Sequence, residues 1–494
     1  MRHRVTEHPT PHAANKARWL TLTVLCLGVL MIVLDSTIVN VALPSIRTDL
    51  GYSETSLVWV VNAYLLTFGG FLLLGGRLGD LYGHRTLFLC GITVFTLASL
   101  ACGLANTQER LIVARAVQGL GGAVVNAVAL SLIMMLFAEA AERAKAMGVF
   151  GFVCAGGGSI GVLLGGFLTS TLSWHWIFLV NIPIGIAVFA LCLILLPHAA
   201  GQAANKHLDV SGAITVTASL MLAVYAIVNG NEAGWLSATT LGFLGAAALL
   251  LAVFLIIQTR VPAPLVPLGL FRLRNLSTAN VVCVLWAAAC FAWFFISALY
   301  LQRVLAYSAL EVGLAFLPAN LIMAVFSVGL SAKLVMRFGQ KGPLASGLLL
   351  AAIGLALFAR APVEGHFALD VLPGMLFIGF GAGVAFNPLL LAAMNDVEPS
   401  QSGLASGIVN TAFMMGGALG LAILASGAAG RTAELLAAGS PALVALNSGY
   451  HVAFGAGAAC SAMGAALCVA LLRRQQPAAG GAPAAAQAHG AAGF

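Results

Sequence analysis

Long apolar runs recur along the whole chain. Each run is about 20 residues long, and apolar and polar side chains do not alternate within it. Inside a lipid bilayer every backbone polar group needs a partner, so only helices and closed barrels can cross. Barrel strands are about half as long and alternate in polarity. The runs therefore predict an all-α integral membrane protein.

Composition supports lipid as the surrounding solvent. Of the 494 residues, 61% are hydrophobic and 8% are charged, and the mean hydropathy is +1.00. Soluble domains carry about 25% charged residues, so a water-facing fold could not cover this much apolar surface. The net charge of +7 is explained by basic loops on the cytoplasmic side of a membrane. We therefore expect the lipid bilayer as a partner, and no nucleic acid.

The sequence predicts fourteen transmembrane helices. Their expected limits are 19–43, 55–75, 87–105, 110–136, 147–171, 176–196, 210–229, 237–259, 277–301, 309–332, 343–361, 370–393, 403–426 and 449–472. Most of the 23 Lys and Arg residues fall in segments on the same side as the N-terminus. This bias predicts that both termini are cytoplasmic, and the first run is expected to be a retained helix.

The chain repeats itself at an offset of 256 residues. Segment 76–85 joins the second and third spans, and segment 332–341 joins the tenth and eleventh, with Gly83 and Gly339 in equivalent positions. Parallel halves of this kind are a known transporter plan. The predicted organisation is a cytoplasmic tail at 1–18, an N-terminal six-helix bundle at 19–197, an inserted helix pair at 207–260, a C-terminal six-helix bundle at 275–472 and a disordered cytoplasmic tail at 473–494.

Asp35 lies inside the first apolar run. A carboxylate at mid-membrane costs about 2.5–3.5 kcal/mol on insertion scales. At 1.5 Å per helical residue it lies roughly 24 Å beyond Trp19, in the far half of the bilayer. It is the only acid well inside a span. Asp35 is either a fixed, hydrogen-bonded acid that pins the first helix, or a group that exchanges a proton as its surroundings alternate.

Arg115 lies in the fourth span, shortly after an outer loop. The residues that share its helix face are Gln118, Gly119, Gly122 and Asn126. A face of polar and small residues suits the interior of a helix bundle. Because arginine stays charged at physiological pH, Arg115 is a candidate electrostatic neighbour of Asp35. The alternative is an arginine that extends to the outer head groups.

The loop between the second and third spans combines glycines with charges. Its candidate functional residues are Gly76, Arg77, Asp80, Gly83 and Arg85. The glycines allow helix ends to turn and to approach closely. Asp80 can sit at a helix N-terminus or pair with an arginine, and such a contact would latch the halves in an outward-open state. The alternative is a solvated, positive-inside loop.

Glycines recur in the fifth span. Gly157, Gly161 and Gly165 are four residues apart, and Gly166 follows. One face of this helix is therefore bare backbone, which permits very close packing.

Four motifs together resemble those of the major facilitator superfamily, in its drug:proton antiporter branch with fourteen transmembrane helices (the EmrB/QacA subfamily). They are Leu34–Ile46, Gly75–Phe88, Arg115–Gly122 and Gly151–Gly185. The resemblance spans roughly residues 19–472. It implies a major facilitator fold in the plasma membrane, with two six-helix bundles plus two extra helices.

The resemblance also assigns roles to residues of this chain. It implicates Arg115 in proton coupling, with Asp35 as the leading proton site. It identifies the glycines of the fifth span as an antiporter motif that supports the interface between the halves. The Gly-Pro pair of that motif is Gly161-Val162 here.

Candidate substrate-cavity residues are Gln118, Asn126, Trp286, Trp293 and Asn410. Aromatic residues crowd the ninth span, where they fit either core packing or a pocket for a bulky apolar ligand. The second half has no acid clearly at mid-membrane, which favours neutral or amphiphilic substrates over strongly cationic ones.

Nothing in the sequence indicates an enzyme. The phosphate-binding pattern G-x-x-x-x-G-K-[ST] and the zinc pattern H-E-x-x-H are both absent. We therefore expect no catalytic residues, no metal and no cofactor, with energy taken from a proton gradient. The predicted function is proton-coupled efflux of drugs or antibiotic-like metabolites by a monomer. The alternative is a secondary carrier of the same fold for a specific solute, metabolite or siderophore.

Overall fold

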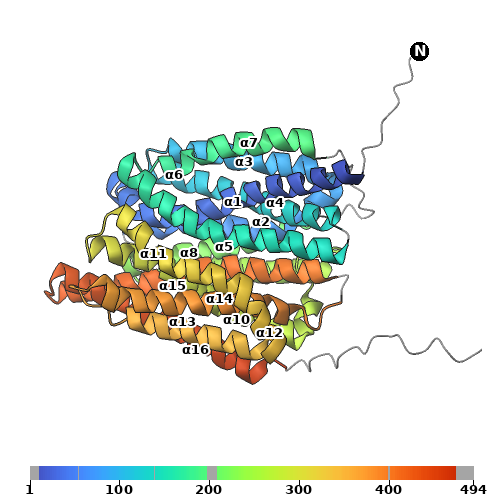
Figure 1. The fold of residues 1–494 in the computed structure, drawn as a ribbon. Helices are drawn as coiled ribbons and strands as arrows, with labels where there is room; N and C mark the ends of the chain where they lie inside the picture. The colour runs from blue at the N-terminus through green and yellow to red at the C-terminus, as the bar shows by residue number, and fades with distance from the viewer. Residues whose placement is uncertain (1–10, 54, 138, 197–207, 399–400, 474–494) are drawn as a thin grey trace, which may run out of the picture.

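The computed structural model describes residues 11–473 except 54, 138, 197–207 and 399–400, and within that part it contains helices and no strand. The helices run side by side in one bundle (Figure 1). In order they are α1 (Pro11–Leu50), α2 (Val58–Tyr82), α3 (His84–Gly103), α4 (Gln108–Leu136), α5 (Ala140–Thr171), α6 (Trp176–Leu179), α7 (Asn181–Leu195), α8 (Val210–Ala233), α9 (Ala238–Arg260), η1 (Leu268–Arg272), α10 (Arg274–Arg303), α11 (Ala309–Val325), η2 (Phe326–Leu330), α12 (Ser331–Phe338), α13 (Lys341–Phe358), η3 (Phe367–Val371), α14 (Leu372–Met394), α15 (Ser402–Ala437) and α16 (Ala442–Leu471).

The predicted class, an all-α membrane protein, is confirmed. Every expected span overlaps a helix, and twelve helices in the described part of the chain are long and apolar enough to cross a membrane. The expected number of fourteen is not reached by this measure. The 32-residue α5 is not among the twelve. The apolar α11 has only 17 residues, because the run ends in the π-helical turn η2 before continuing as α12.

The helices form two groups. Figure 1 shows α1 to α7 on one side of the molecule and α10 to α16 on the other; we call these the N side and the C side. They pack directly against each other through α5 with α11 and through α2 with α15. The inserted helix α8 packs on α9, on α2 and on α15, so it contacts both sides.

The predicted repeat is visible in the backbone. Gly83 separates α2 from α3 with φ = 90°, and Gly339 separates α12 from α13 with φ = 73°. Side chains are disfavoured in this left-handed region, so glycine is the residue that allows each break. The two breaks lie at equivalent positions of the repeat.

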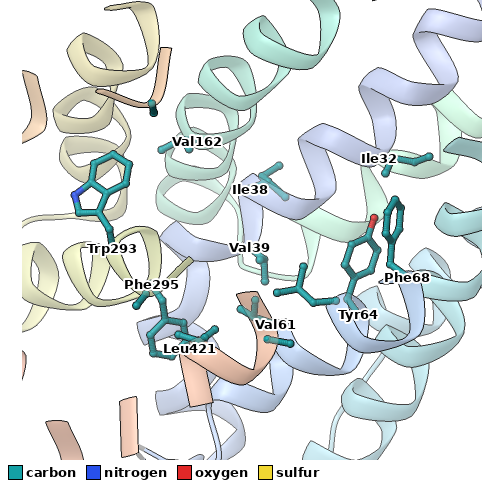
Figure 2. Packing of buried hydrophobic residues seen from close by; sticks show 14 of the residues in the cluster. Ile32, Ile38, Val39, Val61, Tyr64, Phe68, Val162, Trp293, Phe295 and Leu421 are labelled. Carbon is teal, nitrogen blue, oxygen red and sulfur yellow. The ribbon is translucent and has the colours of Figure 1, made fainter. Parts of the chain in front are cut away.

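The N side and the C side share one apolar core. Figure 2 shows Val39 and Val61 of the N side close to Leu421 and Phe295 of the C side, all within a single cluster of buried residues. Burial of this surface across the interface holds the two sides together in the conformation described.

Hydrogen bonds between the two sides lie toward one end of the bundle. We call the end where α1 begins and α16 ends the terminal end (right in Figure 1) and the other the opposite end. Three described bonds join the sides, from Asn62 Nδ2 to Ala418 O at 2.9 Å, from Gln302 Nε2 to Val41 O at 2.9 Å and from Leu310 N to Ser170 Oγ at 3.1 Å. Each involves a residue near the opposite end, where the halves are therefore held closed.

Candidate functional site

The structure brings Asp35 and Arg115 together. Arg115 Nη1 on α4 lies 2.5 Å from Asp35 Oδ2 on α1. Both side chains are fully enclosed, with exposed fractions of 1% and 0%. Arg115 therefore does not extend to the head groups, and the electrostatic neighbour expected from the sequence is confirmed as a direct ion pair.

Two amides complete the surroundings of the Asp35 carboxylate. Gln118 Nε2 donates to Asp35 Oδ1 at 2.7 Å, and Asn181 Nδ2 donates to the same oxygen at 3.0 Å. Gln118 also accepts from Arg115 Nη1 at 2.7 Å and donates to Ser99 Oγ at 2.8 Å. A buried ion pair is tolerated only when further hydrogen bonds satisfy its remaining donors and acceptors, and this network supplies them.

Sequence reasoning did not identify Asn181 or Ser99. Each is a single polar residue with apolar neighbours, Val180 and Ile182 in one case and Ala98 and Leu100 in the other. The isolated polarity of Asn181 within an apolar run was the available signal. The helix pairing that directs it toward Asp35 has no local signature.

Arg115 is held on every side. Its Nε donates to the backbone carbonyl of Val60 at 2.9 Å. Its guanidinium lies 4.4 Å from the ring centroid of Tyr64 and 5.6 Å from that of Phe178. Aromatic faces attract a cation most strongly when water is excluded, so the rings help to hold the guanidinium in this position.

All contributors to this site come from the N side. They lie on α1, α2, α3, α4, α6 and α7. If Asp35 took up a proton, Arg115 would be left as a buried cation without its counter-charge. Removing one partner of a buried pair costs about 3–5 kcal/mol, so protonation would favour a rearrangement of these helices.

The bare face of α5 lies against α1, the helix that carries Asp35. A Cβ on Gly161 would overlap with Thr37 Oγ1 and lie 3.0 Å from Leu34 O. On Gly165 it would lie 2.7 Å from Ile38 O, and on Gly157 it would lie 2.9 Å from Leu30 Cδ1. These glycines thus serve packing within the N side, next to Asp35, rather than the interface between halves that the resemblance implied.

Gly166 alone among the four motif glycines faces the C side. A Cβ on Gly166 would lie 2.5 Å from Ala309 O on α11, and one on Gly313 of α11 would lie 3.0 Å from Val162 O on α5. The backbones of α5 and α11 therefore touch at a crossing that is bare on both helices. Val162, which stands where the motif has proline, lies within the unbroken helix α5.

The structure places part of the expected latch loop. Arg85 is buried, and its Nη2 donates to Leu193 O at the end of α7 at 2.7 Å, within the N side. Gly83 forms the break described above, and a Cβ added to Gly76 would lie 3.8 Å from Ala127 Cβ. Arg77 is half-buried. The Asp80 side chain lies outside the described part, so the latch stays a prediction.

The five substrate-cavity candidates do not share one environment. Gln118 belongs to the Asp35 network. Trp286 and Trp293 are 2% and 3% exposed, and Trp293 packs against Phe316 with ring centroids 5.4 Å apart. These indoles are therefore core residues in this conformation. Asn126 and Asn410 are half-buried, and Asn410 Nδ2 donates to its own helix.

Similar proteins identify the family. The sequence profile of the Major Facilitator Superfamily matches residues 25–421. The puromycin resistance protein pur8 of Streptomyces alboniger is 39% identical over 422 residues, which cover 85% of this chain and 84% of that protein. The cephamycin export protein CmcT of Amycolatopsis lactamdurans is 38% identical over 421 residues, 84% of this chain and 86% of that protein. The tetracenomycin C resistance and export protein of Streptomyces glaucescens is 34% identical over 420 residues, 84% of this chain and 77% of that protein.

A solved structure has the same fold. The nucleoside transporter NupG superposes with a TM-score of 0.64 at 14% sequence identity, covering 92% of this chain and 100% of that one. The profile match, the identity to these relatives and the shared fold agree with the motifs and the repeat. The chain belongs to the Major Facilitator Superfamily, and it is a membrane carrier, not an enzyme.

Proposed function

We propose that this carrier exports hydrophobic or amphiphilic small molecules from the cytoplasm across the plasma membrane in exchange for protons. Its relatives are named as antibiotic resistance and export proteins, which supports the direction and the substrate class. The observation that carries the proton-coupled mechanism is the sealed Asp35–Arg115 pair. A charged pair so deep in a membrane protein marks a proton or ion pathway by default.

Coupling follows from the electrostatics of the pair. In the conformation described, the Asp35 carboxylate accepts hydrogen bonds from three side chains. A proton on Asp35 cancels its attraction for Arg115, and the enclosed guanidinium then needs water or another acceptor. A conformation that admits water to the site supplies it, so proton binding and conformation bias each other.

Helix α5 connects the proposed proton site on α1 to the contact between the N side and the C side. Because the glycine face of α5 carries no side chains of its own, Thr37 and the α1 backbone near Leu34 and Ile38 lie directly against it, so a shift of α1 moves α5. The other face of α5 meets α11 of the C side at Gly166 and Gly313. A shift at Asp35 thereby reaches the contact that keeps the opposite end closed.

The same proposal includes the finer topology. Fourteen spans result if α5 and the continuous segment Ala309–Phe338 cross the bilayer together with the twelve other helices. They form two six-helix bundles, 19–197 and 275–472, with the inserted pair 207–260 between them. The excess of Lys and Arg places both termini in the cytoplasm. Because each bundle pairs within the chain, the monomer is the transporting unit.

The test uses inverted membrane vesicles that respiration energises. Puromycin and a panel of hydrophobic amines should accumulate inside, and each transported compound should dissipate part of the pH gradient, read from a pH-sensitive dye. The Asp35→Asn variant should abolish both signals when transport is normalised to the amount of variant protein in the membrane.

Asp49→Asn is the matched control on the same helix. Asp49 is exposed and accepts a hydrogen bond from Trp174 Nε1 at 2.9 Å, which an asparagine oxygen can also accept. This variant should transport normally. Full transport by Asp35→Asn would remove Asp35 from the mechanism. A wild-type protein that moves neither the panel nor protons would favour the alternative carrier of a specific solute.

A further inference from the structure

A cavity of about 410 Å³ lies near the terminal end, away from the Asp35 network. Its walls come from α2, α8, α9, α10 and α15, and its floor comes from the segment between α9 and α10, including Leu265 and Val266. The volume falls in the range of small-molecule sites. The inserted pair α8 and α9 forms one wall, so the cavity exists only because this pair is present.

The floor of the cavity is fixed in place. Asp209 is buried before α8, and its Oδ2 accepts from Gln258 Nε2 at 2.5 Å and from Leu265 N at 3.2 Å. Gln258 Oε1 accepts from Val266 N at 2.8 Å. These bonds tie the segment after α9 to the inserted pair. The cavity is thus preformed, which lowers the entropic cost of binding.

Two polar side chains line this otherwise apolar cavity, Asn280 on α10 and Thr411 on α15. Asn280 is only 6% exposed, and its Nδ2 donates to Leu276 O at 2.9 Å. Within the described structure, Asn280 Oδ1 and Thr411 Oγ1 have no hydrogen-bond partner. A buried acceptor without a donor destabilises a protein, so a donor from a ligand has a favourable interaction to gain.

The mouth of the cavity faces outward from the bundle. Val281 and Val284 on α10 line the cavity and are 52% and 37% exposed. In a membrane-spanning helix such apolar side chains meet lipid. A ligand can therefore enter from the bilayer, and it needs an apolar body. A lipid acyl chain would fill the space but offers no donor for Asn280 or Thr411.

We propose that this cavity is a binding site for a membrane-dissolved small molecule with an apolar body and one N–H or O–H group. Both oxygens are covered in the conformation described, so the side chain that accepts turns toward the cavity as that group donates to Asn280 Oδ1 or Thr411 Oγ1. The inserted helix pair supplies the wall that encloses the apolar part. The site stands on its own geometry and goes beyond the transport proposal, because no residue of the Asp35 network lines it.

The test compares two photoreactive probes of similar shape on the full-length protein in lipid nanodiscs. 4-Aminobenzophenone carries an N–H donor, and 4-methylbenzophenone does not. Mass spectrometry of the labelled peptides should locate the amine on α10 and α15. Met415, which lines the cavity, should be the main labelled residue, and its neighbour Met414 serves as internal control. Labelling should saturate with increasing probe concentration. The half-labelling concentration should be lower for the amine than for the methyl probe.

Two variants test the hydrogen bond. Asn280→Leu and Thr411→Val should each raise the half-labelling concentration of the amine, about fivefold if that residue receives the donor, and leave the methyl probe unchanged. Asn320→Leu is the matched control, because Asn320 on α11 is 1% exposed and its amide also has no partner in the described chain, yet it lies outside the cavity.

The proposal is overturned if both probes label equally, which would indicate a groove for acyl chains. It is also overturned if labelling is not concentrated on α10 and α15, or if neither variant weakens the amine. Size-exclusion chromatography checks that each variant is folded. If Asn280→Leu does not fold, Thr411→Val decides, together with the ratio between the two probes on the wild-type protein.

Discussion

Asn181 on α7 donates its side-chain amide to Asp35 Oδ1 on α1 at 3.0 Å, across 146 residues of sequence. With Arg115 and Gln118 it makes the carboxylate the acceptor of three hydrogen bonds. Bonds to a charged group contribute about 1.5–3 kcal/mol each, so the position of α7 and the charged state of Asp35 depend on each other.

Loss of the Asn181 amide should therefore weaken the fold and the transport. We expect Asn181→Leu to lower the free energy of unfolding by about 1.5–3 kcal/mol, because the bond it removes is buried and charge-assisted. The measurement is the thermal unfolding midpoint in detergent. Asn229→Leu is the control, since that exposed amide donates only to Tyr225 O of its own helix. Equal midpoints for the two variants would argue against a charge-assisted bond at Asn181.

The Asp35–Arg115 pair should show strong non-additivity. Asp35→Asn leaves a buried guanidinium without its counter-charge and should destabilise the protein by about 3–5 kcal/mol. In the double variant Asp35→Asn/Arg115→Gln both charges are gone, so the loss should be smaller than the sum of the two single losses. Unfolding midpoints of the four proteins complete the cycle. Additive losses would show that the two charges do not interact.

The close packing of α5 on α1 can be tested with one methyl group. Gly161→Ala places a Cβ onto Thr37 Oγ1 and should cost about 1–3 kcal/mol through overpacking. It should also reduce transport, because α1 carries Asp35. Gly156→Ala is the control on the same helix, where a Cβ meets nothing within 4 Å. We expect it to be neutral or slightly stabilising. If both alanines behave alike, the glycine face is not needed for this contact.

We expect α5 and α11 to move apart where they cross during transport. Leu310 N donates to Ser170 Oγ at 3.1 Å, and a Cβ on Gly166 would lie 3.0 Å from Leu310 Cα, so the helices are within reach of a disulfide. The pair Ser170→Cys/Leu310→Cys should cross-link and stop vesicle transport, and a reductant should restore it. Each single variant serves as control. Full activity of the cross-linked protein would show that this crossing stays closed throughout the cycle.

Asp209 should hold the segment that floors the cavity. Asp209→Ala removes the N-cap of α8, worth about 1 kcal/mol, and it also leaves the Leu265 N–H without its acceptor. We expect faster tryptic cleavage at Arg260 and Arg272, which flank the segment. Ser237→Ala is the control, because Ser237 caps α9 without a bond to the segment. Equal cleavage in both variants would mean that the segment is held by packing alone.

Helix positions were predictable from sequence because hydropathy along the chain reflects burial in lipid directly. The repeat was predictable too, since Gly83 and Gly339 occupy equivalent positions in two matching loops. In the structure both glycines adopt positive φ. Asp35 and Arg115 could be named as candidate neighbours, because each is a charge in an apolar run and such charges need partners, but the sequence did not show that they meet. The break at Phe326–Leu330 could not be foreseen, since a π-helical turn has the same apolar composition as the helix around it.

Contacts between distant helices were beyond the reach of sequence reasoning. The spacing of Gly157, Gly161 and Gly165 indicates that α5 has a bare face, but only the packing shows that α1 covers it. Gln118 was expected in a substrate cavity, because a polar residue on an inward helix face looks the same whether it meets a ligand or another side chain. Nothing in the sequence around Asn280 indicates that its side-chain oxygen receives no hydrogen bond.

The Asp35 network draws every one of its members from between residues 35 and 181, and the second copy of the repeat carries Met336 where the first has Asp80. The residues of this network are therefore confined to the N side. In the proposed mechanism, the N side holds the residues that bind the driving proton, and the C side is free of that constraint. If Asp35 is the proton site, substitutions in the C side can alter substrate binding without touching any residue of the Asp35 network.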